Sequence, residues 1–157
     1  MFTAGVLTVS DKGSRGERVD ESGKVIKEAL VSLGAGEIKY GIVPDERQAI
    51  SGKLTEWSDA GVDLVLTTGG TGLTPRDVTP EATLDVVDRV APGFAEAMRA
   101  YGMKQTPVAM LSRAVAGLRG QCLIINLPGS PKAVRECLEV ILPILPHAIE
   151  MMRGGGH

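Results

Sequence analysis

The sequence predicts an α/β protein of three layers, with helices on both faces of a mainly parallel central sheet. Short apolar runs that are typical of buried strands alternate along the chain with segments whose apolar residues recur at helical spacing. Aromatic residues make up only 3% of the chain, so the core must be built mainly from Val, Leu, Ile and Ala. In such a fold the loops that follow the strands meet at one edge of the sheet, where ligands bind.

The length of 157 residues fits one domain, which we expect at residues 1–152, followed by a disordered C-terminal tail at residues 153–157. The formal net charge of −2 provides no broad basic surface for nucleic acid. No apolar segment approaches the ~20 residues of a membrane-spanning helix, and the first residues do not have the pattern of a signal peptide. We therefore expect a cytoplasmic protein that binds neither nucleic acid nor a membrane. Cys122 and Cys137 fit that compartment as reduced, buried thiols without a metal.

The first strand and helix lie near the start of the chain. Residues 4–9 are apolar enough for a buried strand, and a polar, flexible loop at residues 10–16 begins at its carboxyl end. General loop statistics favour a surface turn here over a binding role. From Asp20 the apolar side chains recur at helical spacing until Gly34, which predicts a helix that ends at this glycine. Asp20 or Ser22 could cap its first turn.

The second unit repeats the order of strand and helix. Residues 38–43 alternate between apolar and other residues, which predicts a half-exposed strand. Asp45-Glu46 then begins a helix whose apolar residues continue to Trp57. Asp45 has two possible roles, as a helix N-cap or as a carboxylate of a binding site, and its position alone favours the N-cap. Both roles place it at the carboxyl end of a strand.

The middle of the chain combines a strand, a glycine-rich loop and a helix. Val62–Leu66 is an apolar run, Thr67–Gly72 is small and glycine-rich, and Thr79 is expected to cap the next helix. Glycines at a strand's carboxyl end let backbone N–H groups approach an anion, while Arg76 and Asp77 offer a cation for phosphate and a carboxylate for a metal ion. The glycines are also ordinary turn chemistry, and neither the P-loop nor the dinucleotide fingerprint is present. The clustering of the glycines with Arg76 and Asp77 in one segment nevertheless indicates a site of the kind that binds nucleotides.

Shorter elements are expected after this loop. The helix that begins at residue 79 should run to about residue 90, and a second helix should follow at residues 92–101. Residues 107–111 form a short apolar piece. Residues 114–118 are expected to form a short strand that ends in a turn at Arg119-Gly120.

The chain ends with one further strand and helix. Cys122–Leu127 has the composition of a buried strand, and a Pro-Gly-Ser-Pro turn closes it at residues 128–131. The first helical position falls on Pro131, and the apolar residues of this helix continue to Leu145. Pro143 and Pro146 should kink or interrupt the helix, because proline lacks the backbone N–H that a helix interior needs.

The run Thr67–Gly72, followed by Arg76–Ala82, resembles the signature of the MogA/MoaB family of molybdenum-cofactor biosynthesis, which is shared with the G domain of gephyrin. Further matching segments are spread along the chain: Val9–Asp11, Val43–Glu46, Leu111–Ala114 and Asn126–Pro131. The resemblance covers nearly the whole chain in order. It implies the three-layer α/β fold of that family.

The resemblance also implies an activity, the transfer of AMP from Mg-ATP to the terminal phosphate of molybdopterin with release of pyrophosphate. The substrate then brings its own attacking oxygen, so the protein needs no nucleophilic side chain and acts by positioning and charge stabilisation. Asp45 and Asp77 are implied as the catalytic carboxylates that hold Mg²⁺ and the triphosphate. The implied contacts of the nucleotide and the pterin are Ser10, Asp11, Thr68, Gly69, Gly70, Thr71, Gly72, Ser112, Arg113, Pro128, Gly129 and Ser130.

Within this set, Gly69–Gly72 would cradle phosphate, and Ser112, Arg113 and Gly129-Ser130 would hold the pterin and its phosphate. Alternatives remain: a MoaB-like protein that binds molybdopterin without adenylating it, an assembly module, or a nucleotide-dependent enzyme with another substrate. Both carboxylates and the full glycine-rich loop are present, which favours the adenylyltransferase. The resemblance further implies a homotrimer, or a hexamer of two trimers, and partners that insert molybdate or synthesise molybdopterin.

Overall fold

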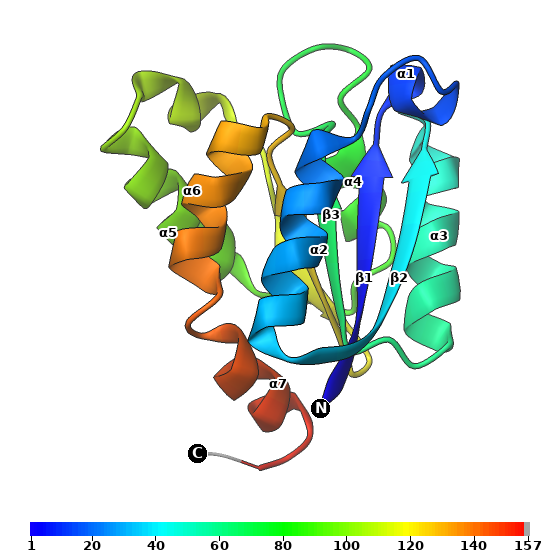
Figure 1. Ribbon diagram of the computed structural model, residues 1–157, viewed down its shortest axis with the longest axis vertical. Helices are drawn as coiled ribbons and strands as arrows, with labels where there is room; N and C mark the ends of the chain where they lie inside the picture. The colour runs from blue at the N-terminus through cyan, green and yellow to red at the C-terminus, as the bar shows by residue number, and fades with distance from the viewer. Residues whose placement is uncertain (156–157) are drawn as a thin grey trace.

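The computed structural model describes residues 1–155 and shows a six-stranded sheet between two layers of helices (Figure 1). The strands are β1 (Phe2–Val9), β2 (Ala35–Val43), β3 (Leu64–Thr68), β4 (Arg89–Val90), β5 (Ala116–Arg119) and β6 (Cys122–Leu127). They lie in the order β2-β1-β3-β6-β5-β4. The first four strands of this order are parallel to one another. Strand β5 runs antiparallel to β6, and β4 runs antiparallel to β5. The predicted fold class, three layers around a mainly parallel sheet, is confirmed.

Two hydrophobic cores lie on the two faces of the sheet. The helices are α1 (Asp11–Ser14), α2 (Glu21–Leu33), α3 (Arg47–Asp59), α4 (Thr79–Leu84), α5 (Pro92–Met103), the 3₁₀ helix η1 (Pro107–Leu111), α6 (Pro131–Ile141) and α7 (Leu145–Met152). On one face α2, α5, α6 and α7 pack over the sheet, and on the other α3 and α4 do (Figure 1). Successive strand residues alternate between these cores, so that Val6 belongs to the first and Leu7 to the second.

Several helix ends follow the sequence signals. Asp20 caps α2, accepting a hydrogen bond from the Gly23 N–H at 2.9 Å. Gly34 ends the helix with a φ of +100°, the left-handed conformation that glycine adopts without strain. Pro143 lies in the break between α6 and α7, and Pro146 lies in the first turn of α7, so the predicted interruption of the last helix is confirmed.

The loop after β1 is more ordered than predicted. Residues 11–14 form the short helix α1 in place of a flexible loop. The Ser10 side chain accepts a hydrogen bond from the Gly13 N–H at 2.9 Å and caps this single turn. Local side-chain capping thus gives a defined conformation to a segment whose composition indicated only polarity.

Two expectations about the helix that follows the glycine-rich loop were wrong. The helix α4 ends at Leu84 and does not reach residue 90, because Arg89–Val90 pairs with β5 as an edge strand. Thr79 is not its N-cap. Val78 occupies that position, and the Thr79 hydroxyl donates instead to the Gly69 carbonyl at 2.9 Å. Both differences come from contacts that are distant in sequence.

The C-terminal residues are anchored where the structure describes them. Arg153 Nη2 donates to the Asp63 carboxylate at 3.0 Å and to the Met1 carbonyl at 3.1 Å. The tail expected at residues 153–157 lies partly outside the described residues. Within residues 1–155 no helix is both long and apolar enough to cross a bilayer.

Both cysteines are free thiols, as expected. Cys122 is buried, while Cys137 is only partly buried, which differs from the prediction. Burial raises the pKa of Cys122 to about 12 and that of Cys137 to about 11. The reactive thiolate is therefore scarce at neutral pH for both residues.

Candidate active site

A cavity of about 710 Å³ opens at the carboxyl ends of β1 and β3. The chain leaves β1 towards α2 on one face and leaves β3 towards α4 on the other, which is the divergence that creates a ligand crevice in open α/β sheets. Eight of the predicted site residues line this cavity: Ser10, Asp45, Thr68, Gly69, Gly70, Asp77, Gly129 and Ser130. They come from segments that are far apart in sequence, so the sheet topology brings them together as expected.

The glycine-rich loop requires glycine at two positions. Gly69 has a φ of +95° and Gly70 a φ of +71°, a region that L side chains rarely adopt. A Cβ at Gly69 would lie 2.4 Å from the Val9 carbonyl oxygen, and one at Gly70 would lie 2.2 Å from Thr79 Oγ1. Gly72 has no positive φ, but a Cβ there would lie 2.9 Å from Asp77 Oδ2. The loop therefore packs its backbone directly against the neighbouring strand and helix.

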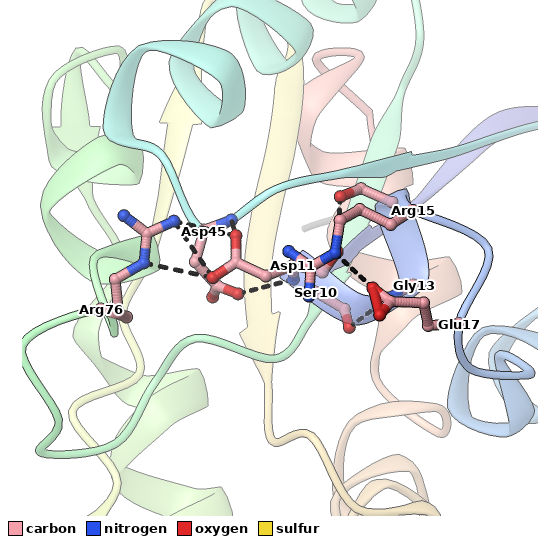
Figure 2. A network of polar contacts seen from close by, with 8 residues as sticks. Ser10, Asp11, Gly13, Arg15, Glu17, Asp45 and Arg76 are labelled. Carbon is pink, nitrogen blue, oxygen red and sulfur yellow. Dashed lines mark hydrogen bonds and ion pairs between the residues drawn. The ribbon is translucent and has the colours of Figure 1, made fainter.

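Asp11 and Asp45 exchange hydrogen bonds beside the cavity (Figure 2). The Asp11 N–H donates to Asp45 Oδ2, and the Asp45 N–H donates to Asp11 Oδ1, each at 2.9 Å. Arg76 donates to both oxygens of Asp11 from Nε and Nη2 at 2.9 to 3.1 Å (Figure 2). These hydrogen bonds lower the pKa of Asp11. Burial raises the pKa of Asp45, and the charges of Asp11 and Asp77 act in the same direction.

The structure excludes one of the two roles that were open for Asp45. Helix α3 begins at Arg47, and Glu46 occupies the N-cap position without a side-chain cap hydrogen bond. The Asp45 carboxylate accepts from the Asp11 N–H and lines the cavity. The N-cap reading of Asp45 is wrong, because a contact across 34 residues of sequence holds the carboxylate away from the helix.

Asp77 is the other predicted catalytic carboxylate that lines the cavity. Its Oδ2 accepts hydrogen bonds from the Thr74 N–H at 3.0 Å and from Thr74 Oγ1 at 2.9 Å. Its charge acts on Asp45 strongly enough to contribute to the raised pKa of that residue. Among residues 1–155, no three His, Cys, Asp or Glu side chains gather into a complete metal cage. Two carboxylates without further protein ligands fit Mg²⁺, which usually keeps several waters and shares its remaining positions with substrate phosphates.

A second cavity of about 290 Å³ adjoins the first. Gly129 and Ser130 line both, so the turn after β6 forms the junction between them. Four further predicted site residues lie here: Thr71, Gly72, Ser112 and Pro128. Its remaining lining is largely apolar and comes from α5, η1 and α6. The predicted site residues therefore divide between two neighbouring cavities.

Asp11 and Arg113 are the two predicted site residues that line neither cavity. Asp11 faces Arg76 and Asp45, as described above. The guanidinium of Arg113 donates to the carbonyls of Gly72 and Asp77 and to the carboxylate of Glu81. Its observed contacts are thus with the protein and not with the space that a ligand would fill.

Sequence reasoning missed several lining residues. Arg18 borders the large cavity, but it lies in a charged run that resembles an ordinary surface loop. Asp20 was expected only as a cap, and it also borders the cavity and accepts from Thr8 Oγ1 at 2.6 Å. Arg99 borders the second cavity and donates to the Ala114 carbonyl at 2.9 Å.

The fold and the site define an α/β ligand-binding protein in which a glycine-rich strand–helix loop and two carboxylates face one cavity. The sequence model of the MoCF_biosynth family, described as "Probable molybdopterin binding domain", matches residues 5–147. The chain belongs to this family, and the resemblance to the MogA/MoaB proteins is confirmed.

Curated relatives and solved structures match over nearly the full chain. A protein of Helicobacter pylori strain J99 named "Molybdopterin adenylyltransferase" is 48% identical over 153 residues, covering 96% of this chain and 87% of the relative. A protein with the same name from Escherichia coli K12 is 40% identical over 165 residues, covering 96% of this chain and 85% of the relative. The solved structure of "the Molybdopterin biosynthesis enzyme MoaB" from Thermus thermophilus superposes with a TM-score of 0.92 at 54% identity, covering 99% of each chain.

Proposed function

We propose that this protein acts in molybdenum cofactor biosynthesis as a molybdopterin adenylyltransferase, which transfers AMP from Mg-ATP to the terminal phosphate of molybdopterin. Two relatives with this name, which are 48% and 40% identical to this protein over most of the chain, support the activity. One structural observation carries the proposal: the glycine-rich loop and the carboxylates of Asp45 and Asp77 face the same cavity of about 710 Å³. Anion-binding backbone and cation-binding oxygens are therefore adjacent, which is what a metal–triphosphate requires.

The reaction needs little covalent chemistry from the protein. A terminal phosphate oxygen of molybdopterin forms a new bond to the α-phosphorus of ATP, and the bond from that phosphorus to the bridging oxygen of the β-phosphate breaks. Pyrophosphate leaves with the electron pair of the broken bond. Since both reactants are anions, the protein must align them and reduce their repulsion. No covalent intermediate with the protein is needed, so the reaction does not require a nucleophilic side chain.

The residues of the two cavities have separable roles in this proposal. Gly69 and Gly70 allow the left-handed backbone and the close packing against Val9 and Thr79 that shape the loop on which the phosphates would bind. Asp45 and Asp77 would hold Mg²⁺, which supplies charge neutralisation on the triphosphate when bound. The turn at Gly129-Ser130 borders both cavities, and it is where the two substrates would meet.

Other features of the proposal rest on the family resemblance. We propose that the protein is cytoplasmic and that it assembles as a homotrimer or as a hexamer of two trimers. Its expected partners are proteins that synthesise molybdopterin or insert molybdate. Free Mg²⁺ and ATP are abundant in the cytoplasm, so the reaction would need no dedicated supply of either.

Replacing Asp77 by asparagine tests the proposed reaction. Asn keeps the size of the side chain and an oxygen that can accept from Thr74, but it removes the charge that would attract Mg²⁺. Pyrophosphate release in the presence of ATP, Mg²⁺ and molybdopterin should fall about a hundredfold, comparable to the loss of one electrostatic contact in a transition state. Molybdopterin binding, measured separately by calorimetry, should persist.

The matched control is Asp85→Asn. Asp85 pairs with Arg47 at the protein surface and lines neither cavity, so this variant should keep wild-type pyrophosphate release. An Asp77→Asn variant that releases pyrophosphate at the wild-type rate under limiting Mg²⁺ would contradict the assignment of the carboxylate. A wild-type protein that binds molybdopterin but never releases pyrophosphate would identify the non-catalytic binding protein instead.

A further inference from the structure

We infer that Arg113 and Glu81 are a positioning pair that fixes the Asp77 carboxylate through the loop Gly72–Asp77, and that neither residue contacts a substrate. The inference rests on the proposed adenylyl transfer for its kinetic test only. It changes the role that the family resemblance implied for Arg113, which was to hold the pterin or its phosphate.

The guanidinium of Arg113 joins the two ends of the loop. Arg113 Nε donates to the Gly72 carbonyl at 2.7 Å, and Nη2 donates to the Asp77 carbonyl at 2.7 Å. The Arg113 N–H also donates to the Thr71 carbonyl at 2.9 Å. Hydrogen bonds from an ionised donor are roughly twice as strong as neutral ones, and the planar fork fixes the separation of its two acceptors. Arg113 therefore sets the distance between the start and the end of the loop.

Glu81 holds that guanidinium in place from the first turn of α4. Its Oε2 accepts from Arg113 Nη1 at 2.6 Å, and its Oε1 accepts from Nη2 at 3.3 Å. The hydrogen bond from Arg113 lowers the pKa of Glu81, so this carboxylate stays ionised at neutral pH. The pair connects the segment between η1 and β5, which contains Arg113, to the helix α4, which contains Glu81.

The loop depends on such external contacts. Residues 72–77 lie between β3 and α4 and belong to neither, and Leu73 within them is 65% exposed. Inside the loop, Thr74 and Asp77 bond to each other, which shapes the turn but does not attach it to the fold. Arg76 attaches the outer side of the loop to Asp11, and Arg113 attaches both of its ends. Without Arg113 the Asp77 carboxylate would lose its fixed position relative to Asp45.

The pair lies outside the lining of both cavities. Neither Arg113 nor Glu81 lines the cavity of about 710 Å³ or the one of about 290 Å³. A loss of activity in a Glu81 variant cannot then be explained by a lost substrate contact. Glu81 is for this reason a sharper test of positioning than Arg113 itself.

The experiment compares Glu81→Gln, Glu81→Ala, Arg113→Lys and Arg113→Ala by kinetics and by amide hydrogen exchange. Positioning predicts a kcat that falls about tenfold to a hundredfold, as in other losses of active-site geometry, with KM for molybdopterin changed less than about threefold. The Mg²⁺ concentration for half-maximal rate should rise in the same variants. Amides of residues 72–77 should exchange faster. Arg113→Lys should not restore the rate, since a lysine cannot bridge both carbonyls.

The control is Arg119→Ala. Arg119 likewise donates to a backbone carbonyl and to a carboxylate, those of Val86 and Asp59, but it lies at the opposite end of β5 and lines neither cavity. Its variant should keep wild-type kcat and wild-type exchange in residues 72–77. Glu81→Gln keeps nearly the same volume, so it keeps the test valid if Arg113→Ala does not fold.

Two results would overturn the inference. The first is a rise in KM for molybdopterin at unchanged kcat in the Arg113 variants, with Glu81 variants unaffected, which would make Arg113 a substrate contact. The second is unchanged exchange of residues 72–77 in both Glu81 variants. If the wild-type protein released no pyrophosphate, the proposed function would fail, whereas hydrogen exchange of the loop would still decide the role of the pair.

Discussion

Replacing Gly69 by alanine probes the closest backbone contact of the large cavity. A Cβ at this position would lie 2.4 Å from the Val9 carbonyl oxygen, at a φ of +95°. The left-handed backbone alone costs an L residue about 1–2 kcal/mol. The contact adds to this, because a backbone carbonyl in a paired strand cannot rotate away, and overpacking of this kind costs about 1–3 kcal/mol. We expect the free energy of unfolding to fall by about 2–5 kcal/mol in total.

Gly16→Ala is a matched control for the conformational part. Gly16 has a φ of +74°, and a Cβ built on it would meet no atom within 4 Å. The free energy of unfolding of this variant should therefore fall only by the cost of the left-handed backbone, about 1–2 kcal/mol. The difference between the two variants isolates the contact of Gly69 with Val9, and it should be about 1–3 kcal/mol.

Urea unfolding at one fixed protein concentration measures this difference, since the stability of an oligomer depends on concentration. With an m-value of about 2 kcal/mol/M, the midpoint for Gly69→Ala should lie about 0.5–1.5 M below that for Gly16→Ala. Equal midpoints at equal m-values would refute the reasoning. They would mean that the loop after β3 can move away from β1 at no cost, and that its close packing does not define the cavity.

Two further predictions concern the ion pair and the assembly. Arg76 lowers the pKa of Asp11 and opposes the raised pKa of Asp45, so Arg76→Gln should move both titrations to higher pH in metal-free protein. Carboxyl-carbon NMR measures both, and an unchanged or lower pKa of Asp11 would contradict the pairing. Light scattering at micromolar concentration should give three or six times the subunit mass. A monomeric mass would contradict the proposed assembly.

The fold was largely predictable because its central strands β1, β3 and β6 are buried on both faces. Residues 4–9 and 122–127 are apolar except for Thr8 and Asn126, and such runs are typical of central parallel strands. The edge strand Arg89–Val90 was missed. A strand of two residues is too short to show an alternating pattern, and its pairing with β5 is set by contacts that a local pattern does not contain.

The composition of the site followed from topology, but the direction of its side chains did not. Residues after successive parallel strands must meet at one edge, which brought Ser10, Asp45 and Gly69 to one cavity as expected. The sequence could not show that Arg113 points away from that cavity. Its acceptors at Gly72 and Glu81 are 41 and 32 residues distant, so the orientation depends on how three segments pack.

Asp45 shows how a failed local rule can indicate function. An Asp beside the start of a helix usually caps it, and such a cap is worth about 1 kcal/mol. Here α3 begins at Arg47 without any side-chain cap, while the carboxylate of Asp45 is held beside Asp11 and close to the charge of Asp77. Burial and like charges raise the pKa of Asp45, so the folded protein stabilises the ionised carboxylate less well than water does. The hydrogen bond from the Asp11 N–H holds the carboxylate in place but does not remove the repulsion from Asp11 and Asp77, which binding of a cation at Asp45 and Asp77 would offset.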